Sequence, residues 1–440
     1  MKLFKSISVT CLAVSMLCVC SVRAEQVKLD VAVSHPLMLA EKKQTAYLKI
    51  GLTGVAVARE LERPPVNVAI VLDRSGSMSG KKIQRAKEAA ILAIDRLSSN
   101  DIVSVVAYNQ NVSVLVPATK VSDRHKIFDA INRLSPGGMT ALFGGVSKGA
   151  HEVKKFLVEN QVNRVILMSD GLANVGPSSP DALAALGSSL IKEGISVTTI
   201  GLGLGYNEDL MVKLARASDG NHAFVEGPEQ LAQIFNYEFN DILSVVANEV
   251  EITIKCAEGI RPVRVLGRNA DIVGQSVSTK INQLYGKQEK YILLEVEVSK
   301  SPAGRTQSVA VVSVNYSDLV TKKHARLNGA TSVTFTGSAK LVRDNTNAKV
   351  MIAAVEQIAN YTNRRALELR DQGKISEAQK VLIYNGKYLF DNAKIYKSPR
   401  LRRFGEGNKA DADNLDPGKW DRQRKKMRKL HHEIDMQQYY

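Results

Sequence analysis

The sequence predicts an α/β domain with a doubly wound, mainly parallel sheet, inserted in a β-sandwich and followed by a helical hairpin and a basic tail. Three observations support this fold class. Apolar runs alternate with helical patterns over residues 66–245, strands of alternating polarity flank this region, and longer helical patterns follow it. Strands that alternate with helices are typical of a parallel sheet covered on both faces. Strands of period two are typical of an antiparallel sandwich.

The first 24 residues have the pattern of a secretory signal peptide. Lys2 and Lys5 supply positive charge, an uncharged apolar stretch runs from Ile7 to Val22, and the segment ending at Ala24 suits cleavage by a signal peptidase. The apolar stretch is shorter than the roughly 20 residues that a membrane-spanning helix needs, so a retained N-terminal anchor is the less favoured alternative. We therefore expect an exported protein that is periplasmic, attached to the cell surface or secreted.

The strands of the sandwich are expected on both sides of the α/β region. Residues 27–33 and 48–52 alternate apolar with polar or small side chains, which is the period of a half-buried strand. The same period returns after residue 247, in the segments 250–256, 292–298, 309–314 and 332–336. Neither set is complete alone, so we expect residues 25–62 and 247–338 to form one sandwich. A free N-terminal arm beside a separate sandwich is the alternative.

The α/β domain is predicted over residues 66–245. Uninterrupted apolar runs mark buried strands at 68–72, 165–168 and 197–200. A hairpin pair is expected at 102–108 and 112–116, and a short strand at 223–225. Apolar residues at helical spacing predict helices over 82–97, 127–134, 145–157, 180–192, 208–217 and 228–245. The alternation of these elements predicts the doubly wound sheet.

Two helices and a basic tail are expected after the sandwich. Residues 346–394 are predicted to form a helical hairpin with its turn at Gly373. One hairpin is too short for a repeat solenoid, which needs about three units. From 396 to 440 the chain is basic and poor in aliphatic residues, so we expect it to be disordered or to fold only on binding. Its most basic stretch, 419–430, is a candidate electrostatic tether to an anionic surface.

Composition limits the chemistry of the mature chain. With 44% hydrophobic and 24% charged residues, the sequence is that of a globular protein with a buried core. Three of the four cysteines lie in the signal segment, so only Cys256 remains, which excludes an intramolecular disulfide and a thiolate metal cluster. The formal net charge of +16 favours anionic partners. For an exported protein, we expect acidic proteins or envelope polymers and no specific nucleic acid.

Oxygen-bearing side chains gather where the first buried strand ends. Asp73, Ser75 and Ser77 are two residues apart, and Gly76 between the serines permits a tight turn. In open α/β sheets, ligands bind at the carboxyl ends of the strands. Three oxygen donors with this spacing can converge on one point above the sheet. On its own, the motif is also consistent with a serine-rich turn that caps the helix over 82–97.

Two more oxygen donors are expected at the same edge of the sheet. Thr140 follows a Gly-Gly turn and precedes a helix, and Asp170 directly follows the second buried strand. Mg²⁺ prefers hard oxygen donors in a near-octahedral array, and Mn²⁺ or Ca²⁺ are alternative ions. The predicted metal site therefore consists of Asp73, Ser75, Ser77, Thr140 and Asp170.

This set of residues resembles the metal-ion-dependent adhesion site of von Willebrand factor type A (VWA) domains. The order of strands and helices over residues 66–245 is similar as well. More narrowly, the glycine turn at 201–203 and the following residues 206–211 are similar to exported bacterial calcium-activated chloride channel-like proteins and to inter-alpha-trypsin inhibitor heavy chains. The channel label is an inherited name, because nothing in the sequence could form a pore.

The resemblance implies a role for each of the five residues. Ser75, Ser77 and Thr140 would contact the metal directly, whereas Asp73 and Asp170 would act through water. Two carboxylates barely neutralise a divalent cation, so a Glu or Asp of a partner could take the remaining coordination position. We therefore expect a binding or adhesion protein that presents Mg²⁺ to an acidic group of a protein or envelope partner.

An enzyme is not expected from this sequence. Ser75 lacks the Gly-x-Ser-x-Gly turn of a nucleophile elbow, and no Ser-His-Asp arrangement is indicated. The alternative function is an envelope structural or assembly factor that acts through the helical hairpin and the basic tail. In that case, the metal would only order the site.

Overall fold

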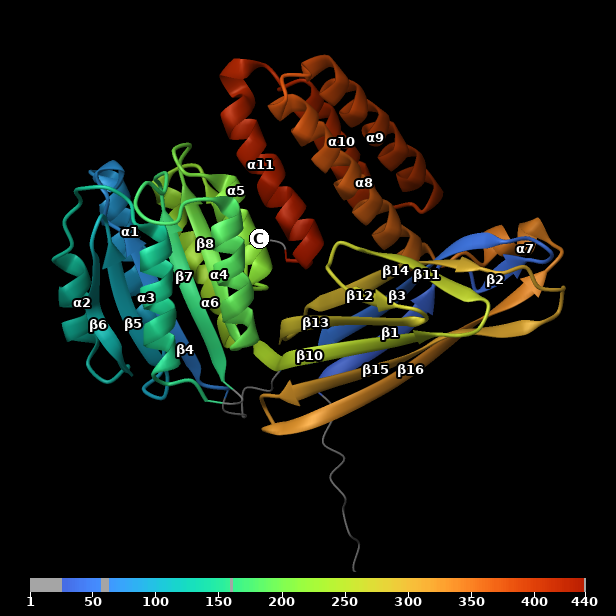
Figure 1. Ribbon diagram of the computed structural model, residues 1–440, viewed down its shortest axis with the longest axis horizontal. Coiled ribbons are helices and arrows are strands. Elements are labelled where there is room, and N and C mark those ends of the chain that lie inside the picture. The colour runs from blue at the N-terminus through green and yellow to red at the C-terminus, as the bar shows by residue number, and fades with distance from the viewer. Residues whose placement is uncertain (1–25, 57–62, 159–160, 439–440) are drawn as a thin grey trace, which may run out of the picture.

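The computed structural model describes residues 26–56, 63–158 and 161–438. The predicted signal peptide lies outside these residues. Figure 1 shows an α/β domain beside a β-sandwich, with a layer of helices from the C-terminal part of the chain above the sandwich. None of the helices in the described ranges is long and apolar enough to cross a lipid bilayer.

The α/β domain contains one six-stranded sheet in the order β6-β5-β4-β7-β8-β9. Its strands are β4 (Val66–Asp73), β5 (Ile102–Tyr108), β6 (Val112–Lys120), β7 (Val162–Ser169), β8 (Ile195–Leu202) and β9 (His222–Val225). Only the pairing of β5 with β6 is antiparallel among these strands. Every residue of β4, β7 and β8 is buried, as expected for strands covered on both faces.

Two groups of helices cover the two faces of this sheet. The helices are α1 (Lys81–Asp95), α2 (Arg124–Asn132), α3 (Leu142–Lys154), α4 (Pro180–Lys192), α5 (Glu208–Ala217) and α6 (Leu231–Leu243), with short 3₁₀ turns at Gly76–Met78 and Pro228–Gln230. Val68 and Ile70 of β4 pack with α1, α2 and α6, whereas Ala69 and Val71 pack with α3, α4 and α5. Successive side chains of a strand point to opposite faces, so β4 contributes to both cores.

The sandwich consists of two sheets, β1-β3-β14-β11 and β12-β13-β10-β15-β16-β2. Its strands are β1 (Val27–Val33), β2 (Leu37–Leu39), β3 (Gln44–Gly54), β10 (Val245–Cys256), β11 (Ile260–Leu266), β12 (Asp271–Val273), β13 (Ser276–Tyr285), β14 (Glu289–Val298), β15 (Thr306–Asp318) and β16 (Lys323–Thr336). Strand β3 pairs with β14 along its length. The chain thus leaves the sandwich after β3 and returns at β10, which is the arrangement that the insertion hypothesis requires.

The C-terminal part of the chain folds into α7 (Ala339–Asp344), α8 (Ala348–Asp371), α9 (Ile375–Ile395), α10 (Pro399–Ala412) and α11 (Pro417–Met436). Helices α8 and α9 form the predicted hairpin, and α10 packs against α9. Helix α11 contacts α5 and β9 of the α/β domain (Figure 1).

The expectation of a disordered tail from 396 onward is wrong for residues up to 438. The few apolar side chains of this segment, including Leu401, Trp420 and Met427, are buried. Its basic residues also have acidic partners in the fold: Lys425 Nζ donates to Glu208 Oε2 at 2.5 Å, and Arg424 Nη2 donates to Asp209 Oδ2 at 2.5 Å. Composition alone treats such charges as solvated, because it does not show which carboxylates lie opposite them.

The α/β domain and the sandwich meet at a buried polar junction. Arg164 of β7 is fully buried and donates to Tyr285 Oη at 2.8 Å and to Thr198 Oγ1 at 3.0 Å. The carboxylate of Asp219 accepts from the backbone N–H of Asn282 at 2.6 Å. Such directional bonds in a buried site define the relative orientation of the two domains, because misaligned partners would remain unsatisfied.

Candidate metal centre

The candidate site lies at the carboxyl edge of the α/β sheet. Strands β4 and β7 are parallel neighbours, with Leu72 opposite Met168. Asp73 ends β4 and Ser169 ends β7, so Asp170 leaves the sheet beside Asp73. The parallel pairing of two strands therefore places two carboxylates at the same edge, as the sequence predicted.

Both carboxylate oxygens of Asp73 are engaged by neighbouring groups. Oδ1 accepts from the backbone N–H of Ser75 at 2.7 Å, and Oδ2 accepts from Ser169 Oγ at 2.5 Å. Burial raises the pKa of the Asp73 carboxyl, while the hydrogen bonds from Ser169 and Ser75 oppose this change. Asp73 thus fixes the start of the serine turn and connects it to the end of β7.

The serine hydroxyls form a short chain that ends at Asp170. Ser75 Oγ lies 3.0 Å from Ser77 Oγ, and Ser77 Oγ donates to Asp170 Oδ1 at 2.7 Å. Ser75 and Asp170 are buried, whereas Ser77 is exposed. The chain of oxygens therefore reaches the surface, where a ligand can approach it.

Gly171 shows that the three hydroxyls surround one point. A Cβ atom added at Gly171 would lie 3.2 Å from both Ser77 Oγ and Thr140 Oγ1, and 3.6 Å from Ser75 Oγ. The structure thus brings together hydroxyls from two separate segments around a small space that Gly171 leaves open. All five residues that the sequence predicted are found at this edge.

A network of backbone and amide contacts positions Thr140. Gly137 and Gly138 both have positive φ, 159° and 84°. Asn109 Nδ2 donates to the carbonyl of Gly137 at 2.7 Å, and the N–H of Thr140 donates to Asn174 Oδ1 at 2.8 Å. Sequence reasoning missed Asn109 and Asn174, because neither belongs to a motif and each acts through a contact distant in sequence.

Sequence reasoning also missed Lys82, which appears there only as the first residue of a predicted helix. In the structure, Lys82 Nζ forms an ion pair with Asp170 Oδ2, and it lies 3.4 Å from the carbonyl of Ser77. The Lys82 ammonium is partly exposed, whereas the Asp170 carboxylate is buried. One oxygen of Asp170 thus faces a serine hydroxyl and the other faces a cation supplied by α1.

The donor set fits a hard divalent cation. Three hydroxyls and two carboxylates offer only oxygen, which is the preference of Mg²⁺. Across residues 26–56, 63–158 and 161–438, no group of three or more His, Cys, Asp or Glu side chains could hold a metal ion. A metal centre in these ranges would therefore depend on hydroxyl ligands such as those of Ser75, Ser77 and Thr140.

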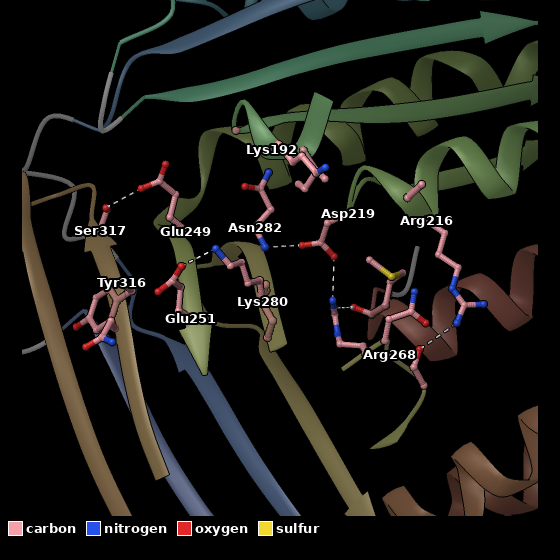
Figure 2. Close-up of a pocket in the computed structure, with 18 of the residues that line it drawn as sticks. Lys192, Arg216, Asp219, Glu249, Glu251, Arg268, Lys280, Asn282, Tyr316 and Ser317 are labelled. Carbon is pink, nitrogen blue, oxygen red and sulfur yellow. Dashed lines mark hydrogen bonds and ion pairs between the residues drawn. The ribbon is translucent and has the colours of Figure 1, made fainter. Parts of the chain in front are cut away.

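A cavity of about 830 Å³ lies between the α/β domain and the sandwich, and Figure 2 shows its charged lining. Asp219 accepts from Arg268 Nη1 at 2.9 Å, and Lys280 Nζ lies 2.5 Å from Glu251 Oε1. These charged groups of the lining thus bind one another across the cavity. The sheet edge remains the better candidate.

Comparison with known proteins agrees with the α/β fold. The model of the von Willebrand factor type A domain matches residues 67–236. Protein sll0103 of Synechocystis sp. is 27% identical over 60% of this chain and 65% of its own length. Human inter-alpha-trypsin inhibitor heavy chain H4 is 25% identical over 49% of this chain and 26% of its own. The chain thus spans less than two thirds of each of these relatives.

Solved structures are similar over most of the chain. A von Willebrand factor type A protein from Catenulispora acidiphila has a TM-score of 0.69 at 17% identity, over 88% of this chain and 90% of that one. The ArnB paralog VWA2 from Sulfolobus acidocaldarius has a TM-score of 0.63 at 17% identity, over 93% and 98%. At this identity, the likeness shows a shared fold.

Proposed function

We propose that this chain, whose residues 67–236 are a von Willebrand factor type A domain, is an exported binding protein that presents Mg²⁺ to an acidic group of a partner. The observation that carries the proposal is the convergence of Ser75, Ser77 and Thr140 within 3.6 Å of one point beside Asp170. Export rests on the signal pattern of residues 1–24 and remains part of the proposal.

Each residue has a role in this proposal. Ser75, Ser77 and Thr140 would hold the ion directly through their hydroxyls. Asp73 orients the turn through its bonds to Ser75 and Ser169, and Asp170 supplies charge beside Ser77. Bound Mg²⁺ would carry two positive charges, and the two carboxylates of the site would only just neutralise them. A Glu or Asp side chain of a partner could therefore bind the ion favourably. Mn²⁺ or Ca²⁺ could use the same oxygen donors.

Exposed apolar side chains next to the site favour a protein over a purely anionic polymer as the partner. Met139 precedes Thr140 and is 53% exposed, Leu172 follows Gly171 and is 60% exposed, and Leu204 precedes Gly205 and is 45% exposed. A Cβ added at Gly205 would lie 2.8 Å from the carbonyl of Asp170, so this loop also borders the site. Apolar contacts around a charged group are typical of protein partners.

The hydroxyls of the site contact other oxygens. Within the described part of the chain, the hydrogen-bond partners of the Ser75 and Ser77 hydroxyls include no imidazole. Ser77 Oγ donates to the Asp170 carboxylate and Ser75 Oγ lies beside Ser77 Oγ, as a shared metal site requires.

Thermal unfolding with and without Mg²⁺ tests the metal site. Metal at about 100 times its dissociation constant should add roughly 2.7 kcal/mol to the free energy of unfolding of the wild type. Thr140→Ala and Asp170→Asn should lose this gain. Asp181→Asn, which changes an exposed aspartate on α4, is the matched control and should keep it. No gain in the wild type, or an equal gain in Thr140→Ala, would overturn the proposal.

Capture from an envelope extract tests the partner. Wild-type protein with Mg²⁺ should retain proteins that are released by chelator and are absent with Asp170→Asn. Retention that is indifferent to chelator and to Asp170→Asn would instead favour the assembly-factor alternative.

A further inference from the structure

One face of α9 is exposed among the residues that the structure describes. Buried residues such as Ala378, Leu382 and Leu389 face α8 and α10, which pack against α9. Figure 1 shows α9 at the outer side of the helical layer, away from the α/β domain. The opposite face of the helix is exposed, so its side chains are free to meet something outside this chain.

Three lysines form a line along this face. Lys380, Lys387 and Lys394 are seven residues apart, which places them on the same side of the helix at intervals of about two turns. All three are exposed, and within the described residues no carboxylate forms an ion pair with them. Two exposed acids lie near the lysines on α9: Asp391, between Lys387 and Lys394, and Glu377, one turn before Lys380. The lysines outnumber these acids, so the face keeps an excess of positive charge.

Large apolar side chains flank the lysines on both sides. Ile383 and Phe390 lie along one side of the line, and Tyr384 and Ile395 lie along the other, by their helical positions. Their exposed fractions are 57%, 37%, 74% and 66%. The ring of Phe390 also lies against Gly405 of α10. Single exposed apolar residues are common on protein surfaces, but four on one helix face beside a line of lysines need an explanation.

We propose that this lysine face, defined by Lys380, Lys387 and Lys394 with their apolar neighbours, binds the surface of a membrane that contains anionic phospholipid. The lysines would meet the headgroup phosphates, and the apolar side chains would enter the boundary between headgroups and acyl chains. Lysine suits this position because its aliphatic stem can lie against apolar groups while the ammonium stays in the polar layer. A soluble polyanion would need only the lysines and would leave the four apolar side chains exposed.

The lysine face lies on α9, apart from the candidate metal centre at the edge of the α/β sheet. Membrane binding by α9 is therefore independent of the metal proposal. The two proposals can be tested separately. Vesicle binding is measured in the presence of EDTA, and it is measured again with the Asp170→Asn variant.

Co-sedimentation with vesicles tests the proposal on the full chain. Vesicles of phosphatidylglycerol mixed with phosphatidylcholine should bind the wild type, and vesicles of phosphatidylcholine alone should bind it much less. Each lysine near an anionic surface strengthens binding about fivefold, so the triple change Lys380→Gln, Lys387→Gln and Lys394→Gln should weaken partitioning about 100-fold. A matched triple, Lys255→Gln, Lys300→Gln and Lys323→Gln, removes the same charge from exposed sites on the sandwich and should have little effect.

A second variant separates lipid insertion from simple charge attraction. Ile383→Ser with Ile395→Ser keeps the lysines and should still weaken vesicle binding about tenfold or more, since two large exposed side chains no longer enter the membrane. Absence of binding to anionic vesicles, or equal losses for the two lysine triples, would overturn the proposal. Unchanged vesicle binding by the serine variant, together with tight binding of heparin, would replace lipid by a soluble polyanion.

Discussion

At the scale of single residues, Lys82 changes how the candidate centre is understood. Its ammonium contacts the same Asp170 carboxylate that would assist a bound Mg²⁺. A fixed cation and a divalent ion next to one carboxylate repel each other, so the lysine must move aside or weaken metal binding. While no metal is bound, the Lys82 ammonium therefore neutralises the charge of the Asp170 carboxylate.

Replacing Lys82 tests this competition. Lys82→Met should raise the affinity for Mg²⁺ about tenfold, which corresponds to about 1.4 kcal/mol, because Asp170 no longer has a competing cation. Isothermal titration with Mg²⁺ measures the change. Lys81→Met alters the neighbouring exposed lysine and is the control. Equal affinities of Lys82→Met and the wild type would show that the ion pair does not oppose the metal.

Gly171 offers a second test at the residue scale. In Gly171→Ala the added methyl group would lie 3.2 Å from Ser77 Oγ and Thr140 Oγ1, in the space assigned to the ion. Stabilisation by Mg²⁺ should disappear, while the metal-free protein should unfold within about 1 kcal/mol of the wild type. Gly407→Ala is the control, because a Cβ there meets nothing within 4 Å. Thermal unfolding of both variants with and without Mg²⁺ gives the comparison, and a retained shift in Gly171→Ala would place the ion elsewhere.

The candidate residues were readable from the sequence because each follows a recognisable signal. Asp73 and Asp170 directly follow buried strands, and parallel strands end at a common edge. Lys82, Asn109 and Asn174 have no such signal, since their importance arises only when distant segments meet. Motif reasoning therefore found the proposed metal ligands and missed the groups that position or oppose them.

At the scale of elements, period and burial explain which predictions succeeded. The apolar runs at 68–72, 165–168 and 197–200 fall within β4, β7 and β8. Strand β13 was missed, because its second half carries Asn282 and Gln283, which belong to the polar junction with the α/β domain. A strand that buries polar partners loses the alternation on which sequence reasoning depends.

Helix α11 was predicted to be disordered because its basic residues were counted without the carboxylates that they bind in the fold. Arg424 and Arg422 lie on the same helix and both form ion pairs with the α/β domain. The side chain of Arg424 is only 17% exposed and contacts Glu208, Asp209 and Asp371, whereas Arg422 is 57% exposed and contacts Glu226. Buried networks lose more than exposed pairs when one partner is removed.

The two arginines therefore predict unequal effects. Arg424→Ala should lower the free energy of unfolding by about 2–4 kcal/mol, because three carboxylates lose a shared cation. Arg422→Ala should have little effect. Urea unfolding measures both, and limited proteolysis should release the C-terminal segment faster in Arg424→Ala. Equal stability of the two variants would mean that the contacts of Arg424 do not stabilise the packing of α11.

At the scale of the whole molecule, buried polar contacts connect the parts of the chain in addition to apolar packing. Arg164 connects β7 to Tyr285 of the sandwich, and Lys425 connects α11 to Glu208 of the α/β domain. Such contacts specify orientation more than they add stability. A fixed orientation would keep the proposed metal edge and the lysine face of α9 at a constant separation, so that a membrane-bound protein would present its metal in a defined direction.

Lys290 is a buried lysine of the sandwich whose charged form is disfavoured by burial. It is fully buried on β14, its Nζ lies 5.0 Å from the centre of the Tyr285 ring, and it has no hydrogen-bond partner among the described residues. Burial lowers its pKa from 10.5 to about 8, although the nearby Asp219 carboxylate acts in the opposite direction. Between pH 8 and 10.5 the unfolded chain therefore holds this proton and the folded chain does not.

The sign of the pH dependence follows from this difference. A state that binds fewer protons gains relative stability as pH rises. The free energy of unfolding should therefore rise between pH 8 and 10.5 through Lys290, by an amount on the order of 3 kcal/mol.

Lys290→Met removes the buried charge at similar volume. The variant should be more stable than the wild type at pH 7, and this advantage should shrink as pH rises through that window. Lys255→Met, at an exposed site, controls for loss of a lysine. Urea unfolding across the range measures the difference, and a constant difference between variant and wild type would mean that Lys290 keeps its proton in the folded protein.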